Sequence, residues 1–456
     1  MRLSLVCALL LAACDDSVGK DSADGATDGT LDGDALAMDV SAELGTIVTV
    51  VIVRWRTEEA TTGYVEFGPD TTYGARTDRT APSTEHEVLL VGTAADTAVH
   101  FRVVVETEAG DAPTSDYDIT TGPLPTGTPS FVASGTMADE WQFNVIPTQG
   151  EVPYVTIVNN LGQIVWYYSP IVKDGNLMRA LITHDRKAVL LGHAGVQGNL
   201  QASVLQYISL DGGTVRDIPY PMFDHDLDEL PDGTVAMIVV DERTRDDGSP
   251  WQADRIVELH PDGTETEVFN AWDELDAEAI AGDGMQPNWT HGNGLDYWPE
   301  EDAYLFSMKE LGTLAKVNRA DGHIEWMIDG RLNQFDFGDD EVVPLQHQFE
   351  MLADGNLLIF DNGTPERGYS RAVELDLDIE ARTADQVWEY IRNPPVMVFA
   401  KGDVHRFDNG NTLVTWSMLG ELQMVTPEGL PTWQLNAELG QAFTFVQPFD
   451  SFYLGG

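Results

Sequence analysis

The stretch "HDLDELPDGTVAMIVV" at 225–240 decides the fold of most of this chain, because it is one copy of an internal repeat. The stretch "HQFEMLADGNLLIFDN" at 347–362 has the same pattern, with a histidine first and a turn glycine eight residues later. The stretch "HGNGLDYWPEEDAYLFSM" at 291–308 repeats it with a longer turn at 299–302. Each copy has the alternation and turn residues of two short β-strands joined by a tight turn.

A second type of hairpin alternates with the first and ends in a tryptophan, in "NNLGQIVWYY" (159–168), "RADGHIEWMI" (319–328) and "TPEGLPTWQL" (426–435). An inner and an outer hairpin together make a four-stranded antiparallel unit. Units of roughly 45–65 residues recur about six times from 130 to 456. This period predicts an all-β chain with a six-bladed β-propeller. We expect Trp166, Trp326 and Trp433 to pack between blades, and "AWDELDAEAIAG" (271–282) to form a helical insertion.

The repeat predicts that three histidines meet. In a propeller the innermost strand of each blade lines the central channel, so residues at its start face one another. His225, His291 and His347 occupy that point in three consecutive blades; the next position in phase is Gly402, and Arg179 is roughly in phase one blade earlier. Three imidazoles could hold zinc or copper, or could supply a nucleophile, a general base and an oxyanion stabiliser.

The residues around the histidines favour the second chemistry. Asn293 is two residues after His291, so its side chain shares a strand face with the imidazole. Lys309 lies in the following strand, and Arg179 approaches from another blade. A cationic side chain weakens a nearby site for a dication but suits an anionic substrate. The pattern therefore predicts a site for an anionic substrate, with no metal ion.

Residues 39–122 have a different character from the propeller region. Short β-branched and aromatic runs there alternate with Gly, Pro, Asp and Thr, which predicts a small β-sandwich. The pattern resembles a fibronectin type III domain, with Trp55 and Tyr64 as core aromatics, in the role of a spacer or docking module. The segment "PLPTGTP" at 123–129 separates it, as a hinge, from the propeller at 130–456.

The first residues predict export. A short positive start, an apolar run and "LAAC" ending at Cys14 resemble a bacterial lipobox over residues 1–14. The resemblance implies cleavage before Cys14 and acylation of its thiol; the alternative is an ordinary cleaved signal peptide. Residues 15–38 are rich in Asp, Gly, Ala, Ser and Thr, which predicts a disordered acidic tether. We expect a lipoprotein of the bacterial cell envelope, facing the periplasm or the cell surface.

Composition narrows the partners and the chemistry. The chain has 76 acidic and 25 basic residues, a net charge of −51, which argues against a nucleic-acid partner. Attachment to an anionic membrane would have to come from the lipid anchor. The two cysteines, Cys7 and Cys14, leave the mature chain without a disulfide or a catalytic thiol. An anionic substrate would need a local cationic pocket set against this charge.

Four motifs together carry a family resemblance. The motifs "NWTHGNGLDYW", "QHQFEMLADGNLLIFDNG", "HDLDELPDGT" and "GDVHRFDNGNTLVTWS" resemble those of the bacterial arylsulfate sulfotransferases, over most of 130–456. The resemblance implies an exported six-bladed propeller without a cofactor. Such an enzyme would move a sulfuryl group from an aryl sulfate ester to a phenol, without a nucleotide donor, through a transiently sulfated histidine.

Matching motifs carry over residue roles. His347 in "QHQ" would be the nucleophile, while His291 in "WTHGN" and His225 in "HD" would bind and polarise the sulfate oxygens or act as acid and base. Asn293 would be a further donor to the substrate. Lys309 stands where the family usually has an arginine, so it keeps the charge but loses the bidentate fork.

Two other classes of function stay open on the sequence alone. One is a non-catalytic, lipid-tethered propeller that binds glycans, proteins or anionic ligands. The other is a metal or quinone enzyme on a similar propeller. The aromatic side chains Trp289, Tyr297 and Trp298 beside His291 could stack on a phenol ring or belong to the core.

Overall fold

The computed structural model describes residues 31–137, 141–149, 152–170, 175–195, 199–280, 286–338, 343, 345–438 and 442–455. The predicted signal peptide, Cys14 and residues 15–30 of the predicted tether lie outside these ranges. The last tether residues include a 3-10 turn, η1 (Gly33–Ala35), whose Asp34 carboxylate accepts hydrogen bonds from Ser115. Within the described residues, no helix has the length and apolar character needed to cross a membrane.

The N-terminal domain is built around one long strand, β2 (Val51–Gly68). Its first half pairs with β1 (Met38–Leu44) and β4 (Ser83–Leu90), and its second half pairs with β3 (Ala75–Arg76) and β5 (Ala98–Thr107). β5 also pairs with β6 (Gly110–Pro113) and β7 (Tyr117–Thr120). Trp55, Val65 and Phe101 are buried in one hydrophobic cluster with residues of both halves. The fibronectin type III-like identity of this domain stays a prediction.

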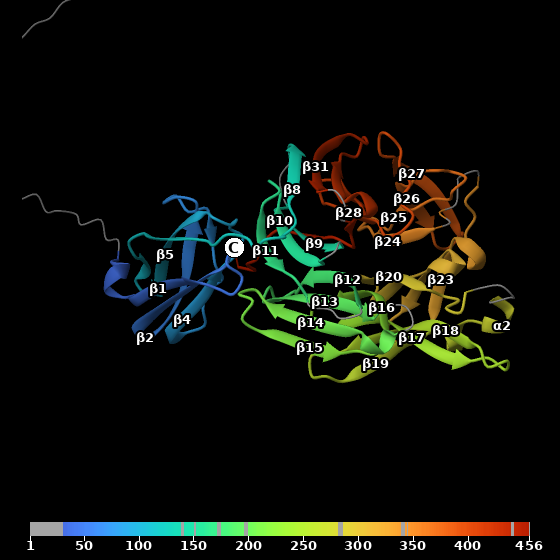
Figure 1. Cartoon of the computed structure of the whole chain (residues 1–456), viewed down its shortest axis with the longest axis horizontal. Helices are drawn as coiled ribbons and strands as arrows, with labels where there is room; N and C mark the ends of the chain where they lie inside the picture. Colours follow the sequence, from blue (N-terminus) through green and yellow to red (C-terminus); the bar gives the residue numbers. More distant parts are fainter. Residues whose placement is uncertain are drawn as a thin grey trace, which may run out of the picture.

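The rest of the chain forms the predicted six-bladed β-propeller (Figure 1). Four blades have four antiparallel strands each. From the inner to the outer strand, the second blade has β12 (Gly175–Ile182), β13 (Ala188–Gly195), β14 (Val204–Ser209) and β15 (Val215–Pro219), and the third has β16 (Phe223–Glu229), β17 (Val235–Thr244), β18 (Pro250–Leu259) and β19 (Glu265–Asn270). The fourth blade has β20 (Gly292–Trp298), β21 (Ala303–Met308), β22 (Thr313–Asn318) and β23 (Ile324–Ile328). The fifth has β24 (Gln346–Met351), β25 (Leu357–Asp361), β26 (Arg371–Asp378) and β27 (Thr383–Tyr390).

The other two blades close the ring with strands from both ends of the propeller region. In the first blade, β11 (Ile164–Tyr168), β10 (Tyr154–Asn159) and β9 (Phe143–Gln149) are completed on the inside by β32 (Ala442–Phe443) and β33 (Gln447–Phe449). In the last blade, β28 (Asp403–Arg406), β29 (Thr412–Trp416), β30 (Glu421–Val425) and β31 (Pro431–Ala437) are completed on the outside by β8 (Phe131–Gly135). Strands from both ends of the propeller region thus complete the first and last blades and hold them in one ring.

Short helices lie between strands. The predicted helical insertion is confirmed as α1 (Ala271–Glu274) and α2 (Ala277–Ile280), between β19 and β20. The remaining 3-10 turns are η2 (Leu200–Ala202), η3 (Lys309–Leu311), η4 (Gly330–Leu332) and η5 (Ser417–Leu419).

The tryptophans at the blade ends hold neighbouring blades together, as predicted. Trp166 Nε1 donates to the Leu210 carbonyl of the next blade at 2.9 Å. Trp433 Nε1 donates in the same way to Asn160 of the first blade at 2.9 Å. Trp326 is buried, with its ring edge against Phe335. Each indole buries a large apolar surface, and the N–H groups of Trp166 and Trp433 each donate to a backbone carbonyl.

Carboxylates in the central channel link the inner strands. Asp226 Oδ2 accepts from the Leu295 backbone N–H of the next blade at 3.0 Å and from Gln348 Nε2 at 2.6 Å. Asp403 Oδ2 accepts from the Val446 backbone N–H at 2.9 Å, and burial raises the pKa of Asp403 to about 7. Some of the many acidic side chains of the chain therefore serve as hydrogen-bond acceptors between blades.

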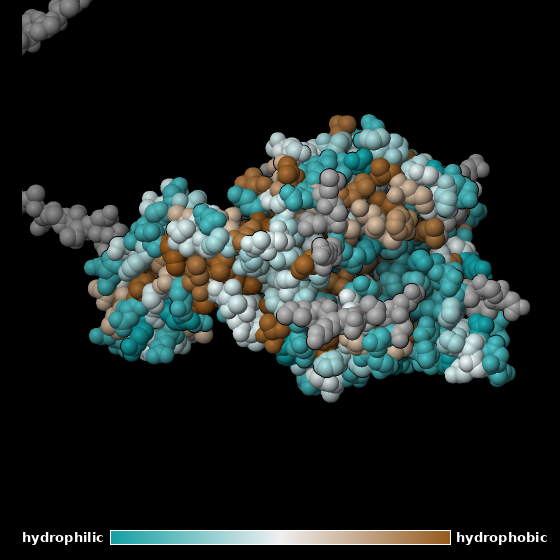
Figure 2. All heavy atoms as spheres, in the orientation of Figure 1, coloured by the Kyte–Doolittle hydropathy of each residue, from teal (hydrophilic) through white to brown (hydrophobic). Residues whose placement is uncertain are grey.

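The N-terminal domain packs directly on the propeller. Ile47 and Val91 share a hydrophobic cluster with Phe143 and Phe452, and Figure 2 shows hydrophobic residues where the two parts meet. The Tyr453 hydroxyl accepts from the Val91 backbone N–H at 2.8 Å and donates to the Leu89 carbonyl at 2.9 Å.

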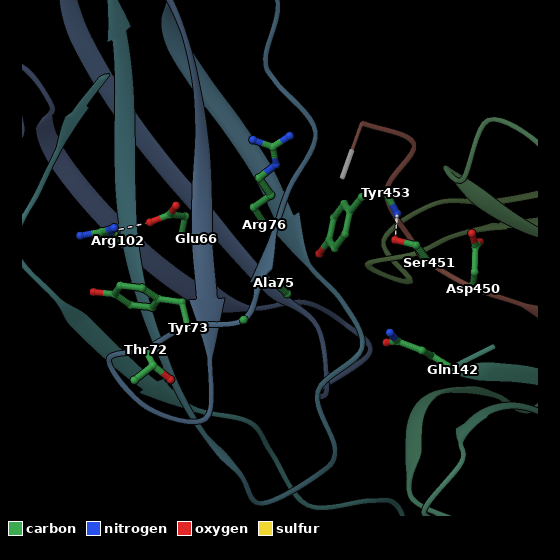
Figure 3. Close-up of a pocket in the computed structure, with 11 residues that line it drawn as sticks. Glu66, Thr72, Tyr73, Ala75, Arg76, Arg102, Gln142, Asp450, Ser451 and Tyr453 are labelled. Atoms are coloured by element: carbon green, nitrogen blue, oxygen red, sulfur yellow. Dashed lines mark hydrogen bonds and ion pairs between the residues drawn. The ribbon is translucent and has the colours of Figure 1, made fainter. Parts of the chain in front are cut away.

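A cavity of about 460 Å³ lies beside this contact. Figure 3 shows Arg76, Arg102 and Glu66 on its N-terminal side, facing Ser451 and Tyr453 of the C-terminal segment. The Arg102 guanidinium is already held by Glu66 at 2.6 Å, and Arg76 donates to the Gly455 carbonyl at 2.8 Å. Arg76 therefore serves the contact between the domains, whereas the charge of Arg102 is paired within the N-terminal domain.

Candidate active site

The repeat brings histidines of neighbouring blades together. His225 lies in β16, His291 directly precedes β20, and His347 is in β24, all at innermost strands. Each of these strands has a break in register near its histidine. The backbone φ angles of His225 and His291 are 58° and 47°, in the left-handed region. A bulge and a left-handed residue re-aim a side chain, and such features concentrate at functional sites.

His225 and His291 form a direct pair. Their Nε2 atoms are 3.2 Å apart, and their ring centroids are 4.8 Å apart. His347 lies close enough to this pair for the charge of His225 to contribute to its lowered pKa. The structure shows the predicted contact between His225 and His291 and places His347 in the innermost strand of the next blade.

Asn362 sets the proton position on His347. Nδ1 of His347 is 2.5 Å from Oδ1 of Asn362, while Nδ2 of Asn362 donates to the backbone carbonyls of Val398 and Lys401, each at 2.7 Å. Because the amide nitrogen is committed to these carbonyls, the amide oxygen faces His347 and accepts the Nδ1 proton. The lone pair is then on Nε2. Burial lowers the pKa of His347 to about 3, so this ring is a neutral base at pH 7.

The His225–His291 pair holds one proton. Burial opposes a charge on His225, but Asp224 outweighs it and raises the pKa of His225, with Oδ1 of Asp224 3.0 Å from its Nδ1. Burial and the charges of His225 and Lys309 lower the pKa of His291 to about 3. His225 therefore donates its Nε2 proton to the Nε2 lone pair of His291. A ring whose pKa is raised therefore lies beside a ring whose pKa is lowered.

The other predicted site residues occupy different positions. Asn293 is fully buried; its Nδ2 donates to the Gln346 carbonyl at 3.0 Å and its Oδ1 accepts from Ser307 at 2.7 Å. These contacts position the strand that carries His347, so the role of Asn293 as a substrate donor stays a prediction. Lys309 is at the site: its Nζ is 3.0 Å from Glu310 Oε1, and its charge contributes to the lowered pKa values of His291 and His347.

Arg179 lies in the channel. Its Nε is 3.6 Å from Asp226 Oδ1, and its guanidinium is over the Phe445 ring. Its charge also acts on the buried carboxyl of Asp403. The substrate-binding role of Arg179 stays a prediction, whereas its contacts give it a structural role as counter-charge to the channel carboxylates.

A cavity of about 740 Å³ opens onto His225 and His291. Met178, Leu200 and Met222 give it an apolar wall. Thioether and aliphatic groups pack well against an aromatic ring. Among the residues that the structure describes, no three His, Cys, Asp or Glu side chains are grouped to hold a metal ion.

The aromatic residues near His291 are not part of this wall. Trp289 is fully buried and packs edge-on against Trp272. The Tyr297 ring lies against Tyr304 at a tilt of 52°, and the Trp298 ring lies under Lys316. The choice between core and substrate contact, left open by the sequence, is settled as core for Trp289.

Sequence reasoning missed Asp224, Asn362 and Lys401. Asp224 precedes His225, so the adjacency of a carboxylate and a histidine was a visible signal. Asn362 ends the quoted repeat that His347 begins, and Lys401 precedes Gly402, the next in-phase position. The burial of the Lys401 ammonium is a property of the folded structure alone.

Comparisons with known proteins show the family to which the chain is similar. A family model described as Arylsulfotransferase (ASST) matches residues 131–429. The arylsulfate sulfotransferase AssT of Escherichia coli O6:H1 is 25% identical, over 36% of this chain and 40% of that protein. The match therefore spans less than half of the length of this curated relative.

Solved structures give weak likenesses. A protein of unknown function from Bacteroides caccae is 15% identical with a TM-score of 0.43, covering 68% of this chain and 100% of that chain. Virginiamycin B lyase from Staphylococcus aureus is 13% identical with a TM-score of 0.35, covering 68% and 99%. The periplasmic gluconolactonase of Pseudomonas aeruginosa is 13% identical with a TM-score of 0.37, covering 79% and 98%.

Proposed function

The chain belongs to the arylsulfotransferase family, and from this premise we propose that it transfers a sulfuryl group from an aryl sulfate ester to a phenolic acceptor. The transfer would pass through a sulfated His347 and use no nucleotide sulfate donor. The observation that carries the proposal is the geometry of the histidines: Asn362 Oδ1 lies 2.5 Å from Nδ1 of His347, and the Nε2 atoms of His225 and His291 lie 3.2 Å apart.

The first half-reaction forms the intermediate. Nε2 of His347 attacks the sulfur, a bond from nitrogen to sulfur forms, and the bond from sulfur to the aryl oxygen breaks. The departing phenolate takes the proton held by the His225–His291 pair and leaves as a phenol. The ring of His347 becomes positive in this step, and the Asn362 oxygen that accepts its Nδ1 proton stabilises that charge.

The second half-reaction reverses the first with another phenol. The acceptor gives its proton to the histidine pair and attacks the sulfur, and the electron pair of the nitrogen–sulfur bond returns to Nε2 of His347. Sulfuryl transfer, like phosphoryl transfer, depends mainly on in-line placement and charge stabilisation. Lys309 supplies positive charge to the sulfuryl oxygens, and the Met178, Leu200 and Met222 wall accommodates the aryl ring.

The direct test mixes the purified full-length chain with an aryl sulfate that releases a coloured phenol. We expect release that requires an acceptor phenol and that equals, mole for mole, the sulfated acceptor formed. Release into water without an acceptor would indicate a sulfatase instead. No release with a panel of aryl sulfates would contradict the proposal and favour a binding propeller.

Replacing Asn362 with leucine is expected to lower kcat by roughly 10²-fold, with less than about a threefold change in KM, because the nucleophile would lose its fixed tautomer. Steady-state kinetics at fixed acceptor concentration would measure both constants. An Asn409→Leu variant in an exposed turn is the matched control. A proportional rise in KM with kcat unchanged would show that Asn362 acts on substrate binding alone.

Replacing Asp224 with asparagine is expected to move the alkaline limb of the kcat/KM profile to lower pH. In the wild type Asp224 raises the pKa of His225, so the acid stays protonated above pH 6.5. Without the carboxylate, burial would lower that pKa, and activity along the wild-type alkaline limb should fall about tenfold for each unit by which the pKa drops. The acid limb should not move, because His347 titrates near pH 3. An unshifted alkaline limb, relative to an Asp262→Asn control, would rule out His225 as the acid.

We also propose a location and a role for the N-terminal part. Residues 1–14 would direct export, and Cys14 would carry a lipid anchor at the bacterial cell envelope, facing the periplasm or the cell surface. The pairing of β2 with strands on both of its halves supports a fibronectin type III-like spacer. The net charge of −51 supports small-molecule partners over nucleic acid.

A further inference from the structure

Lys401 carries a buried ammonium group next to the candidate nucleophile. It lies directly before Gly402, the position in the last blade that is in phase with the histidines. Its backbone carbonyl accepts from Asn362 Nδ2 at 2.7 Å, and the same Asn362 accepts the Nδ1 proton of His347. Its φ angle is 61°, so a bulky residue is held in a conformation that side chains rarely adopt.

The ammonium of Lys401 has no partner among the described residues. Its Nζ is buried and makes no hydrogen bond there. By contrast, Nζ of Lys309 lies 3.0 Å from Glu310, and Nζ of Lys316 lies 2.8 Å from Glu325. The chain has 76 acidic residues, so a buried lysine without a carboxylate is conspicuous. A buried unpaired charge is unfavourable unless it serves an anion that binds there.

The charge of Lys401 is directed at the proposed reaction site. It acts on His347 together with Lys309 and His225, and contributes to the lowered pKa of that ring. Burial lowers the pKa of Lys401 to about 8, so most of the group is charged at pH 7. Lys309 already shares its charge with Glu310, whereas the charge of Lys401 is available in full to an incoming anion.

We propose that Lys401 is a further catalytic residue, whose ammonium donates hydrogen bonds to the non-bridging sulfuryl oxygens while the group is on the donor, on His347 and on the acceptor. This inference rests on the proposed function. No bond to the lysine forms or breaks; it stabilises the charge on the sulfuryl oxygens. In the absence of an aryl ester, the same group would bind inorganic sulfate.

The test measures sulfate binding by calorimetry on the full-length chain, for the wild type and for Lys401→Met. We expect the substitution to weaken sulfate binding roughly 10- to 100-fold, the range of a charge-assisted hydrogen bond in a buried site. The kcat/KM for an aryl sulfate should fall roughly 10²-fold. Wild-type affinity should also decline as pH rises above about 8, as Lys401 loses its proton, and the decline should vanish in the variant.

Two controls separate a catalytic from a structural role. Lys187→Met removes a lysine whose side chain is 81% exposed, and it should leave binding and activity unchanged. The melting temperature of Lys401→Met should equal or exceed that of the wild type, because the variant removes an unpaired buried charge. A lower melting temperature with unchanged sulfate affinity would overturn the proposal in favour of a structural lysine.

The outcomes also separate this proposal from the proposed function. Unchanged sulfate affinity in Lys401→Met, or no sulfate binding by the folded wild type, would overturn the role of Lys401 even if aryl sulfates are turned over. No turnover in the wild type, with sulfate binding that depends on Lys401, would overturn the sulfotransferase proposal and leave an anion-binding site.

Discussion

Replacing His347 with alanine is expected to lower kcat/KM for sulfuryl transfer by at least about 10⁴-fold, the largest effect of any substitution in this chain. His347 would supply the protein atom that bonds to the sulfur, so the sulfated intermediate cannot form without it. The fold should tolerate the change, because among the described residues the ring makes one side-chain hydrogen bond, to Asn362. The remaining activity would come from the cations and the histidine pair, which still bind the ester.

The measurement is acceptor-dependent phenol release, with near-ultraviolet circular dichroism to confirm the fold of the variant. His323→Ala is the matched control, since its side chain is 70% exposed and pairs with Glu274, and neither residue lines the cavity. A His347→Ala variant that keeps more than a tenth of the wild-type rate would contradict the assignment of the nucleophile. The same assay on His291→Ala would then follow.

Replacing His225 with glutamine is expected to lower kcat/KM by roughly 10³-fold for esters of weakly acidic phenols. The loss should be less than about tenfold for esters of nitrophenols, because a stable phenolate leaves without a proton. The reason is that Asp224 keeps the proton on His225, whose Nε2 lies 3.2 Å from the unprotonated Nε2 of His291. Glutamine keeps a polar side chain of similar length that can donate a hydrogen bond, but it cannot act as a general acid.

A series of aryl sulfates that differ in the acidity of the leaving phenol measures this effect. The plot of log kcat/KM against phenol pKa should be steeper in the variant than in the wild type. Equal losses across the series would contradict a proton-donating role and leave His225 as a binding residue for the sulfate oxygens.

The propeller could be predicted because short sequence patterns, repeated at regular intervals, determine its blades. Turn glycines Gly233 and Gly355 lie at equal distances after an in-phase histidine, and the copy at 291–308 repeats the pattern with a longer turn. The same phase places His225 and His291 at matching points of adjacent inner strands, so their meeting follows from the repeat. A repeat fixes equivalent positions around an axis, whatever the side chains between them.

The chemistry of the site could not be predicted in the same way. Asp224, Asn362 and Lys401 act through a proton position, an amide orientation and a buried charge, and none of these has a periodic signal. Arg179 is also in phase, but its guanidinium is beside the carboxylate of Asp226. The burial of Trp289 could not be predicted either, because apolar character alone does not distinguish a core residue from one that lines a binding cavity.

The central claim is that the sulfuryl group rests on His347, and peptide mass spectrometry tests it most directly. The full-length chain would be incubated with an aryl sulfate and no acceptor, then digested under mildly alkaline conditions that preserve a nitrogen–sulfur bond. The account predicts one added sulfuryl group on His347, lost when a phenol is added and absent from Asn362→Leu at short times. A sulfuryl group on His225 or His291, or steady turnover with no modified histidine, would contradict it.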